Sequence, residues 1–355
     1  MKKKKSNKGF TLIELIAVIV VIAIIAVISF QVITNRITSS KEKTYNIQIN
    51  NIKSAAKKYM LENSTIDKYH LNTLCISIKT LQEKGYLEKG DIINPNTSEK
   101  FDSEKNYVKI KYDLDKNQYD YSFTDICTYS IVTPASETII SDNDIKIVNK
   151  DAGLYETTDS YVFKGKNPNN YIEFNNTIWR IISIDKETMM IKIINLADNQ
   201  KVISETGFIE ELNNDFINGT TYNETNKEKI NSNSKWNSGV INSLDSALTL
   251  KSAEKQSNSY NTISLLTVGE YIDASLDKNC YNTKNCDSYL SQNKNYWLLN
   301  KTSDNKNWYI ATNNQASSVV ASSDHLFHVY PCLNLKISNQ ISSGDGSSSN
   351  PYKLK

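Results

Sequence analysis

The chain has 355 residues with 41 basic and 39 acidic side chains, which give a formal net charge of +2. This length leaves room for more than one domain. The near-neutral balance does not indicate a nucleic-acid-binding surface, which needs an excess of basic side chains. The sequence contains no nucleophile motif, paired-carboxylate motif or phosphate-binding glycine loop, so it predicts neither an enzyme nor a cofactor or metal site.

The first thirty residues differ from the rest in composition. Five lysines and no acidic residue precede Gly9, and Glu14 is the only charged residue from Phe10 to Phe30. Twenty-one residues in a helix extend about 31 Å, enough to cross the hydrocarbon core of a bilayer. The lysines predict that the N-terminus stays in the cytoplasm, so that the chain after Phe30 lies outside the cell membrane in a single-pass topology.

The boundary between the basic and the apolar part carries a family signature. The segment Gly9-Phe10-Thr11-Leu12-Ile13-Glu14 resembles the cleavage and methylation motif of type IV prepilins and of the pseudopilins of related secretion machines. The resemblance implies that a prepilin peptidase removes residues 1–9 as a leader and that the new N-terminal Phe10 is N-methylated. It also implies that an assembly platform joins the apolar helix to other pilin subunits, forming the core of a surface filament.

Glu14 requires a physical reason, because a charged side chain within a membrane helix costs about 2.5–3.5 kcal/mol on insertion scales. Cleavage after Gly9 would create an α-amino group at Phe10, the nearest cation able to neutralise Glu14 of a neighbouring subunit. That pair would fix the axial register between subunits, so Glu14 is expected to act in filament assembly. The alternative is an ordinary signal anchor in which Glu14 is incidental, and it leaves the Gly9–Phe10 junction unexplained.

An apolar stripe continues the helix beyond the membrane segment. Its members recur at spacings of four and three, the period of one helix face, and are Tyr45, Ile49, Ile52, Ala56 and Tyr59. Since no Pro or Gly occurs between Phe10 and Glu62, we expect one helix over residues 10–62, of which 10–30 span the membrane. This also resembles pilins, whose fold is a long helix packed on an antiparallel sheet.

Residues 63–129 are expected to form the head that packs on this helix. Ser77 and Gly85 are typical N-terminal and C-terminal caps of a short helix between them. Two alternating segments, 107–112 and 118–123, predict a hairpin of antiparallel strands. The chain is therefore predicted to belong to the α+β class, with a small antiparallel sheet on a long helix.

Five cysteines follow the membrane segment, on the side where disulfides form readily. Cys75 and Cys127 bracket the head, and a bridge between them would close a loop of about fifty residues and stabilise it by a few kcal/mol. The alternative is two unpaired thiols. Cys280 and Cys286 have a spacing that suits the staple of a small surface loop, which leaves Cys332 unpaired and, we expect, buried.

The composition changes after residue 129. Residues 130–146 are rich in Ser, Thr and Asp and include Pro134, which predicts a linker. Residues 147–355 are expected to form a separate, β-rich mixed domain, in which Thr267 and Glu270 match a capping box that opens a helix to about residue 276. The segments expected as strands are 161–163, 171–174, 178–184, 189–194, 296–299, 308–310 and 333–336, the first four as a meander.

This C-terminal domain carries a second resemblance. It rests on Leu265–Tyr271, Tyr296–Asn300, Leu333–Lys336 and Gly344–Gly346, which together resemble an uncharacterised domain of Firmicute surface proteins. The order of a helix, two Trp-containing strands and a final strand next to a proline is also similar to C-type-lectin-like folds. The chain has Tyr330-Pro331-Cys332 where many copies of the first domain carry Arg-Pro, so no binding residue is transferred.

Several side chains of this domain could bind a ligand, and each has a structural alternative. They are Trp236, Trp297 and Trp308 as platforms for sugars, His325 and His328 as metal ligands, and Asp345 as part of a cation site. Tryptophans in strand patterns are more often core residues. The histidine pair lacks supporting ligands and favours a solvated loop, and the glycines on both sides of the aspartate favour a tight turn.

These observations predict a minor type IV pilin-like subunit, carried in or at the tip of a surface filament. The C-terminal domain would be displayed for adhesion to an unidentified surface ligand or for initiation of assembly. One alternative is a pseudopilin of a type II secretion or DNA-uptake (competence) machine. Another is a signal-anchored, lectin-like surface adhesin, in which the pilin part is only a carrier. No catalytic residue and no nucleic-acid partner is predicted for any of them.

Overall fold

The computed structural model describes residues 11–113, 116–148, 150–197, 202–203, 208–219, 221–244, 258–277, 279–280, 288–320 and 325–355. The chain divides into two units, Met1–Ile131 and Val132–Lys355, and each has a hydrophobic core of its own. Helices and antiparallel sheets occur in both units, which confirms the predicted α+β class.

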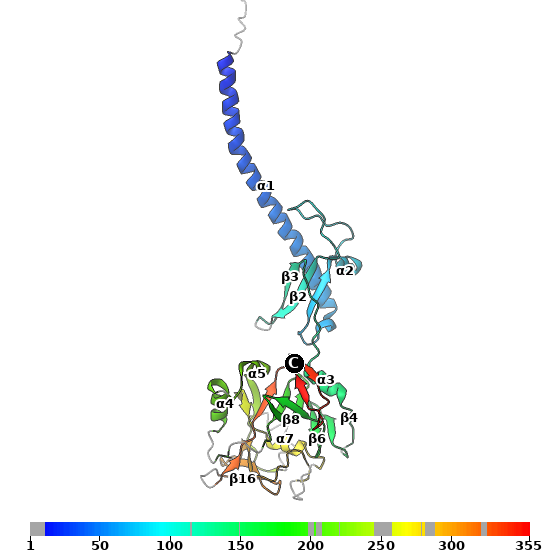
Figure 1. Ribbon diagram of the computed structural model, residues 1–355, viewed down its shortest axis with the longest axis vertical. Helices are drawn as coiled ribbons and strands as arrows, with labels where there is room; N and C mark the ends of the chain where they lie inside the picture. Colours follow the sequence, from blue (N-terminus) through cyan, green and yellow to red (C-terminus); the bar gives the residue numbers. More distant parts are fainter. Residues whose placement is uncertain are drawn as a thin grey trace, which may run out of the picture. The chain divides into compact units, whose positions relative to one another are not determined.

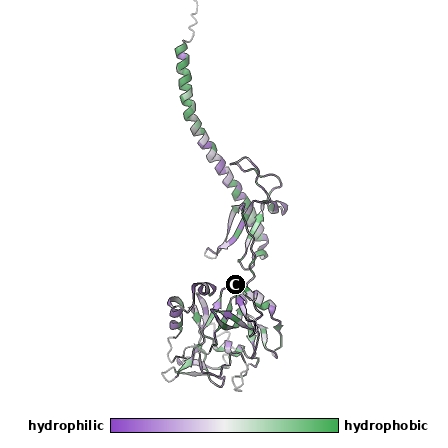
Figure 2. Ribbon diagram, in the orientation of Figure 1, coloured by the Kyte–Doolittle hydropathy of each residue, from purple (hydrophilic) through white to green (hydrophobic). Residues whose placement is uncertain are grey.

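Unit 1 is built on one long helix, α1 (Leu12–Glu62), as the uninterrupted pattern predicts. Its 51 residues extend about 77 Å at helical rise. Thr11 is the N-cap, and at the other end the backbone N–H of Asn63 donates to the carbonyls of Tyr59 and Met60. Figure 2 shows that the N-terminal half of α1 is strongly apolar, whereas its C-terminal half alternates between apolar and polar faces.

The C-terminal half of α1 packs on an antiparallel sheet (Figure 1). The described strands follow the order β1-β2-β3, and the elements after α1 are η1 (Ser64–Asp67), β1 (Thr73–Ser77), α2 (Ile78–Glu83), β2 (Tyr107–Asp113) and β3 (Gln118–Thr124). Ile52 and Ala56 of the predicted stripe share one buried cluster with Val108 and Ile110 of β2. Each fully buried isoleucine stabilises such a core by about 1.5–3 kcal/mol.

The short helix of the head begins and ends as its capping residues predict. The Ser77 hydroxyl accepts the backbone N–H of Thr80 at 3.0 Å and so caps α2. Gly85 follows the helix with a φ of 79°, a left-handed conformation that glycine adopts without strain.

Unit 2 is organised around a large sheet that contains ten of the described strands. Their bounds are β4 (Ile145–Lys146), β5 (Gly153–Glu156), β6 (Ser160–Lys164), β7 (Tyr171–Phe174), β8 (Thr177–Asp185), β9 (Ile191–Ile194), β13 (Ile263–Ser264), β18 (Cys332–Leu335), β19 (Ile341–Ser343) and β20 (Tyr352–Leu354). The main order is β13-β18-β9-β8-β6-β5-β4, and β7 pairs with both β8 and β20.

The remaining described elements of unit 2 include a second sheet with the order β10-β17-β14-β15-β16 and the hairpin β11-β12. The strands are β10 (Val202–Ile203), β11 (Ser234–Asn237), β12 (Asn258–Asn261), β14 (Tyr296–Lys301), β15 (Asn307–Ile310), β16 (Ala316–Val319) and β17 (Phe327–His328). The helices are α3 (Ala135–Asp142), α4 (Phe208–Asn218), α5 (Glu224–Lys229) and α7 (Val268–Asp273).

The structure differs from the predicted linker over residues 130–146. Most of this segment belongs to unit 2, where it forms α3 and β4. Ala135 and Ile139, four residues apart, are fully buried in the core of unit 2. Ile140 also packs against this core, while the remaining residues of the helix are polar and give the segment the composition of a linker.

The predicted meander over residues 161–194 is also wrong in its connectivity. β6 pairs directly with β8, while β7 lies between them in sequence but pairs with the start of β8 and with the C-terminal strand β20. The alternation of apolar residues marks these segments as strands, but it carries no information on a partner almost two hundred residues away.

Candidate functional site

The N-terminal half of α1 has no core of its own to pack on. The large apolar side chains from Leu12 to Phe30 keep between 47 % and 77 % of their surface exposed. The helix is long and apolar enough to cross a bilayer. An apolar surface of this size requires lipid or other apolar helices around it.

Glu14 lies in the first turn of this helix and is held by its N-cap. Its Oε2 atom accepts hydrogen bonds from the backbone N–H and the hydroxyl of Thr11, both at 2.9 Å. In return, the Thr11 hydroxyl accepts the backbone N–H of Glu14 at 3.3 Å. This capping box satisfies polar groups that would otherwise be bare in lipid. Gly9 and Phe10 themselves lie outside the described residues.

A profile described as the prokaryotic N-terminal methylation motif matches residues 4–30. The chain has the N-terminus of a type IV pilin-like prepilin. The prepilin motif implies processing by a prepilin peptidase and assembly with other subunits, and it suggests a structural subunit instead of an enzyme. Together with the apolar helix it supports a membrane-anchored protein that later enters a surface filament. Searches of curated proteins and of solved structures return no match to the chain.

The prepilin head is closed by a disulfide between Cys75 and Cys127, whose Cα atoms are 5.8 Å apart. Beside it, Thr73 and Ser130 exchange two backbone hydrogen bonds of 3.0 Å. Both links join β1 to the last residues of unit 1, more than fifty residues further along the chain. The head therefore keeps its end attached to its first strand.

The other cysteines lie in unit 2. Cys280 is disulfide-bonded, and Cys286, its predicted partner, lies outside the described residues. Cys332 is free and fully buried in β18, as expected for the cysteine without a partner. Burial raises the pKa of the Cys332 thiol far above its ordinary value, so this thiol stays protonated and unreactive.

The tryptophans are core residues and cannot serve as sugar platforms. Trp236 and Trp297 are each 1 % exposed and Trp308 is 5 % exposed. The indole N–H of Trp236 donates to the carbonyl of Asn261, and that of Trp308 to the carbonyl of Ile241, both at 2.8 Å. Their faces and their polar ends are therefore used inside unit 2.

Each histidine of the candidate metal pair lies against an aromatic ring. His325 lies edge-on to the ring of Phe327, and His328 stacks on the ring of Tyr330. Within the described ranges, no group of three or more His, Cys, Asp or Glu side chains lies close enough to hold a metal ion.

Asp345 stabilises a turn between β19 and β20. Its carboxylate accepts the backbone N–H of Ser347 at 2.9 Å, and its flanking residues Gly344 and Gly346 have φ values of 98° and 77°. A Cβ atom at Gly344 would lie 2.0 Å from the carbonyl oxygen of Pro351, so the turn requires glycine there. The bonds that Ser347 and Asn350 donate lower the pKa of Asp345, in keeping with a carboxylate that organises a turn.

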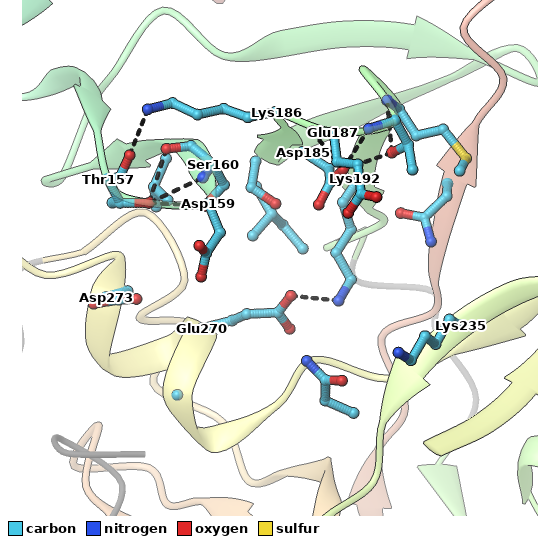
Figure 3. A pocket seen from close by; sticks show the side chains of 18 of the residues that line it. Thr157, Asp159, Ser160, Asp185, Lys186, Glu187, Lys192, Lys235, Glu270 and Asp273 are labelled. Atoms are coloured by element: carbon cyan, nitrogen blue, oxygen red, sulfur yellow. Dashed lines mark hydrogen bonds and ion pairs between the residues drawn. The ribbon is translucent and has the colours of Figure 1, made fainter. Parts of the chain in front are cut away.

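A cleft of about 970 Å³ lies on the main sheet of unit 2 (Figure 3). Its floor contains a row of side chains that are paired directly across four strands: Val162 of β6 with Ser183 of β8, Ser183 with Lys192 of β9, and Lys192 with Asn334 of β18. Directly paired residues share one face of a sheet. The walls are α7, β11 and the turns at 157–160 and 185–188.

The centre of the cleft is an ion pair between Lys192 and Glu270, drawn as a dashed line in Figure 3. Glu270 comes from α7, where its other carboxylate oxygen accepts the backbone N–H and hydroxyl of Thr267 in the predicted capping box. The Lys192 ammonium also lies over the ring of Trp236, 4.6 Å from its centroid. These contacts hold the floor and two walls in one fixed arrangement. The sequence indicated the capping box but not the cleft.

Proposed function

We propose that this protein is a minor type IV pilin-like subunit that carries a displayed C-terminal unit. The observation that carries the proposal is the apolar half of α1, whose described large apolar side chains are exposed and which lies within the match to the methylation motif over residues 4–30. In the membrane this surface contacts lipid. In a filament the apolar helices of other subunits replace the lipid, so the same surface serves both states.

The proposed processing follows from the N-terminal residues. The prepilin peptidase cuts between Gly9 and Phe10, and the new N-terminal Phe10 is methylated. The α-amino group then lies one residue before Thr11, whose capping bonds hold Glu14 at the start of the helix. Glu14 pairs with the amino group of a neighbouring subunit and sets the register between them.

The size of unit 2 supports a sparse or terminal position in the filament. It comprises residues 132–355, more than half of the chain, and would crowd a shaft in which every subunit carried one. We therefore place the subunit at the tip or at intervals along the fibre, where unit 2 is displayed for adhesion or for initiation of assembly.

Intact-mass analysis of sheared surface filaments tests this function. A chain that begins with N-methylated Phe10, found within the filaments, is the expected result. An intact Met1 start confined to the membrane would instead identify a signal-anchored surface protein. The matched variant is Gly9→Ala, in which the leader should remain attached; a normally shortened and assembled product in that variant would contradict the proposal.

A further inference from the structure

Positive and negative side chains nearly balance in the cleft of unit 2, which is lined by four lysines and five carboxylates. Its charged side chains are Lys164, Lys186, Lys192, Lys235, Asp159, Asp185, Glu187, Glu270 and Asp273. Most are engaged within the protein: Lys192 with Glu270, Lys186 with Glu156 at 2.6 Å, and Asp185 with the backbone of its own turn. Lys164 and Asp159 also have partners.

The charged groups of the cleft that have no partner among the described residues are Lys235, Glu187 and Asp273. One positive and two negative groups on three different elements do not create a strong electrostatic potential of one sign in the cleft. An anionic ligand such as a phosphate would have one free ammonium to pair with and two carboxylates to repel it. A cationic ligand would find its two free carboxylates on separate walls. The cleft therefore favours an uncharged ligand.

Most of the other side chains that line the cleft are uncharged and polar, and Val162, Ile182, Met190 and Ile272 are its apolar members. Ser183, Asn237 and Asn334 line the cleft, are half-buried, and have side chains that make no hydrogen bond to any described residue. A ligand can replace water on such groups, and each hydrogen bond exchanged in this way contributes about 0.5–1.5 kcal/mol net. An asparagine amide both donates and accepts, as a hydroxyl group does, whereas a phosphate only accepts and an ammonium only donates. The pattern matches a molecule rich in hydroxyl groups.

The spacing of these groups indicates a ligand larger than one sugar ring. Ser183 and Asn334 lie on either side of Lys192 in the cross-strand row, two strand spacings or about 10 Å apart. Asn237 lines the cleft from β11, next in sequence to the buried Trp236. The cleft volume lies near the upper end of the range of about 300–1,000 Å³ that is typical of ligand pockets.

From these observations we propose that the cleft of unit 2 binds a neutral oligosaccharide, with Ser183, Asn237 and Asn334 as its hydrogen-bonding residues. The proposal deepens the function given above and rests on it for the role at the cell surface, because it names the ligand class that the displayed unit would contact. It uses hydrogen bonds in place of an aromatic platform, since the tryptophans are buried.

Isothermal titration calorimetry on the full chain tests the proposal. The protein is kept in a polyoxyethylene detergent, which has no sugar headgroup that could compete. The neutral probes are maltotetraose, cellotetraose and N-acetylchitotetraose, and a hyaluronan tetrasaccharide serves as an anionic probe of the same length. Saturable binding of at least one neutral probe is expected, and weaker binding of the anionic one.

Single variants identify the site. Asn237→Ala and Asn334→Ala should each raise the Kd about tenfold, as expected for the loss of one or two hydrogen bonds. The matched control is Asn167→Ala, which changes an exposed asparagine in the loop between β6 and β7, outside the cleft, and should bind as the wild type does. If an asparagine variant fails to fold, hydrogen exchange on the wild-type protein replaces it: the bound saccharide should protect residues 183–188 and 234–237.

Three results would overturn the inference: no binding of any neutral probe, preference for the hyaluronan fragment, or equal Kd values in the cleft variants and the control. Filament incorporation is measured separately, so the two proposals fail independently. Asn334→Ala should still be shortened and incorporated, and Glu14→Ala should still bind the saccharide.

Discussion

The disulfide between Cys75 and Cys127 should supply much of the stability of unit 1. The two cysteines are 52 residues apart, and the chain-entropy relation for a loop of this length gives about 4 kcal/mol at 25 °C. Both side chains are half-buried, so a Cys75→Ala/Cys127→Ala double variant leaves little new cavity. We therefore expect the loss of stability to arise mainly in the unfolded state, because the unfolded chain gains conformational entropy when the disulfide is absent.

Hydrogen exchange measured by mass spectrometry gives the clearest assay, because it reports each unit separately. A loss of about 4 kcal/mol should accelerate the exchange of the slowest amides in β2 and β3 roughly a thousandfold. Peptides from β8 and β9 serve as the internal control and should exchange as in the wild type, since the disulfide lies wholly in unit 1. An increase of less than about tenfold in β2 and β3 would show that the loop closure contributes little.

Three further outcomes are expected. Glu14→Ala should leave leader removal intact and reduce incorporation into filaments, measured by immunoblotting of sheared filaments against the cell fraction; wild-type incorporation would remove Glu14 from the assembly step. Thr267→Ala breaks the capping box of α7 and should lower the free energy of unfolding of unit 2 by about 1 kcal/mol in urea titrations followed by tryptophan fluorescence, whereas Thr267→Ser should retain most of it; equal losses would contradict the capping role. Burial raises the pKa of Tyr271 to about 12, above its value near 10 in an unfolded chain. The stability that the protonated Tyr271 contributes is therefore present below pH 10 and is lost as the pH rises toward 12. The urea midpoint of unit 2 should fall above pH 10, and it should fall less steeply in Tyr271→Phe. An identical fall in both proteins would show that Tyr271 does not cause the pH dependence.

Tryptophan fluorescence can report unit 2 alone because all four tryptophans lie in it. Trp179, Trp236, Trp297 and Trp308 are each at most 5 % exposed, so their emission should shift strongly when unit 2 unfolds. This separation makes the predictions for the two units independent of each other.

Features with a local cause could be predicted from the sequence. The helix α1 follows from an unbroken apolar pattern, α2 from its capping residues Ser77 and Gly85, and α7 from the capping pair Thr267 and Glu270. Thr11 and Glu14 have the same Thr-x-x-Glu pattern as Thr267 and Glu270. The capping box between Thr11 and Glu14 could therefore also have been predicted from the sequence, although it was not among the features predicted.

Features that depend on distant partners could not be predicted. The segment that forms α3 has too few apolar residues to indicate a helix until a core is present for Ile139 to enter. The alternation of apolar and polar residues in β7 indicates a strand, but the pairing of this strand with β20 depends on a segment at the far end of the chain.

The sequence by itself determined the apolar helix that is long enough to cross a membrane, the prepilin motif and the antiparallel hairpin of the head, because each arises from residues close together in the chain. Only the tertiary structure decided that a polar cleft exists. Val162, Ser183, Lys192 and Asn334 come from four strands spread over more than 170 residues, and they become neighbours only through the register of the folded sheet. Pairing across a sheet is set by the packing of both its faces, which no short stretch of sequence contains.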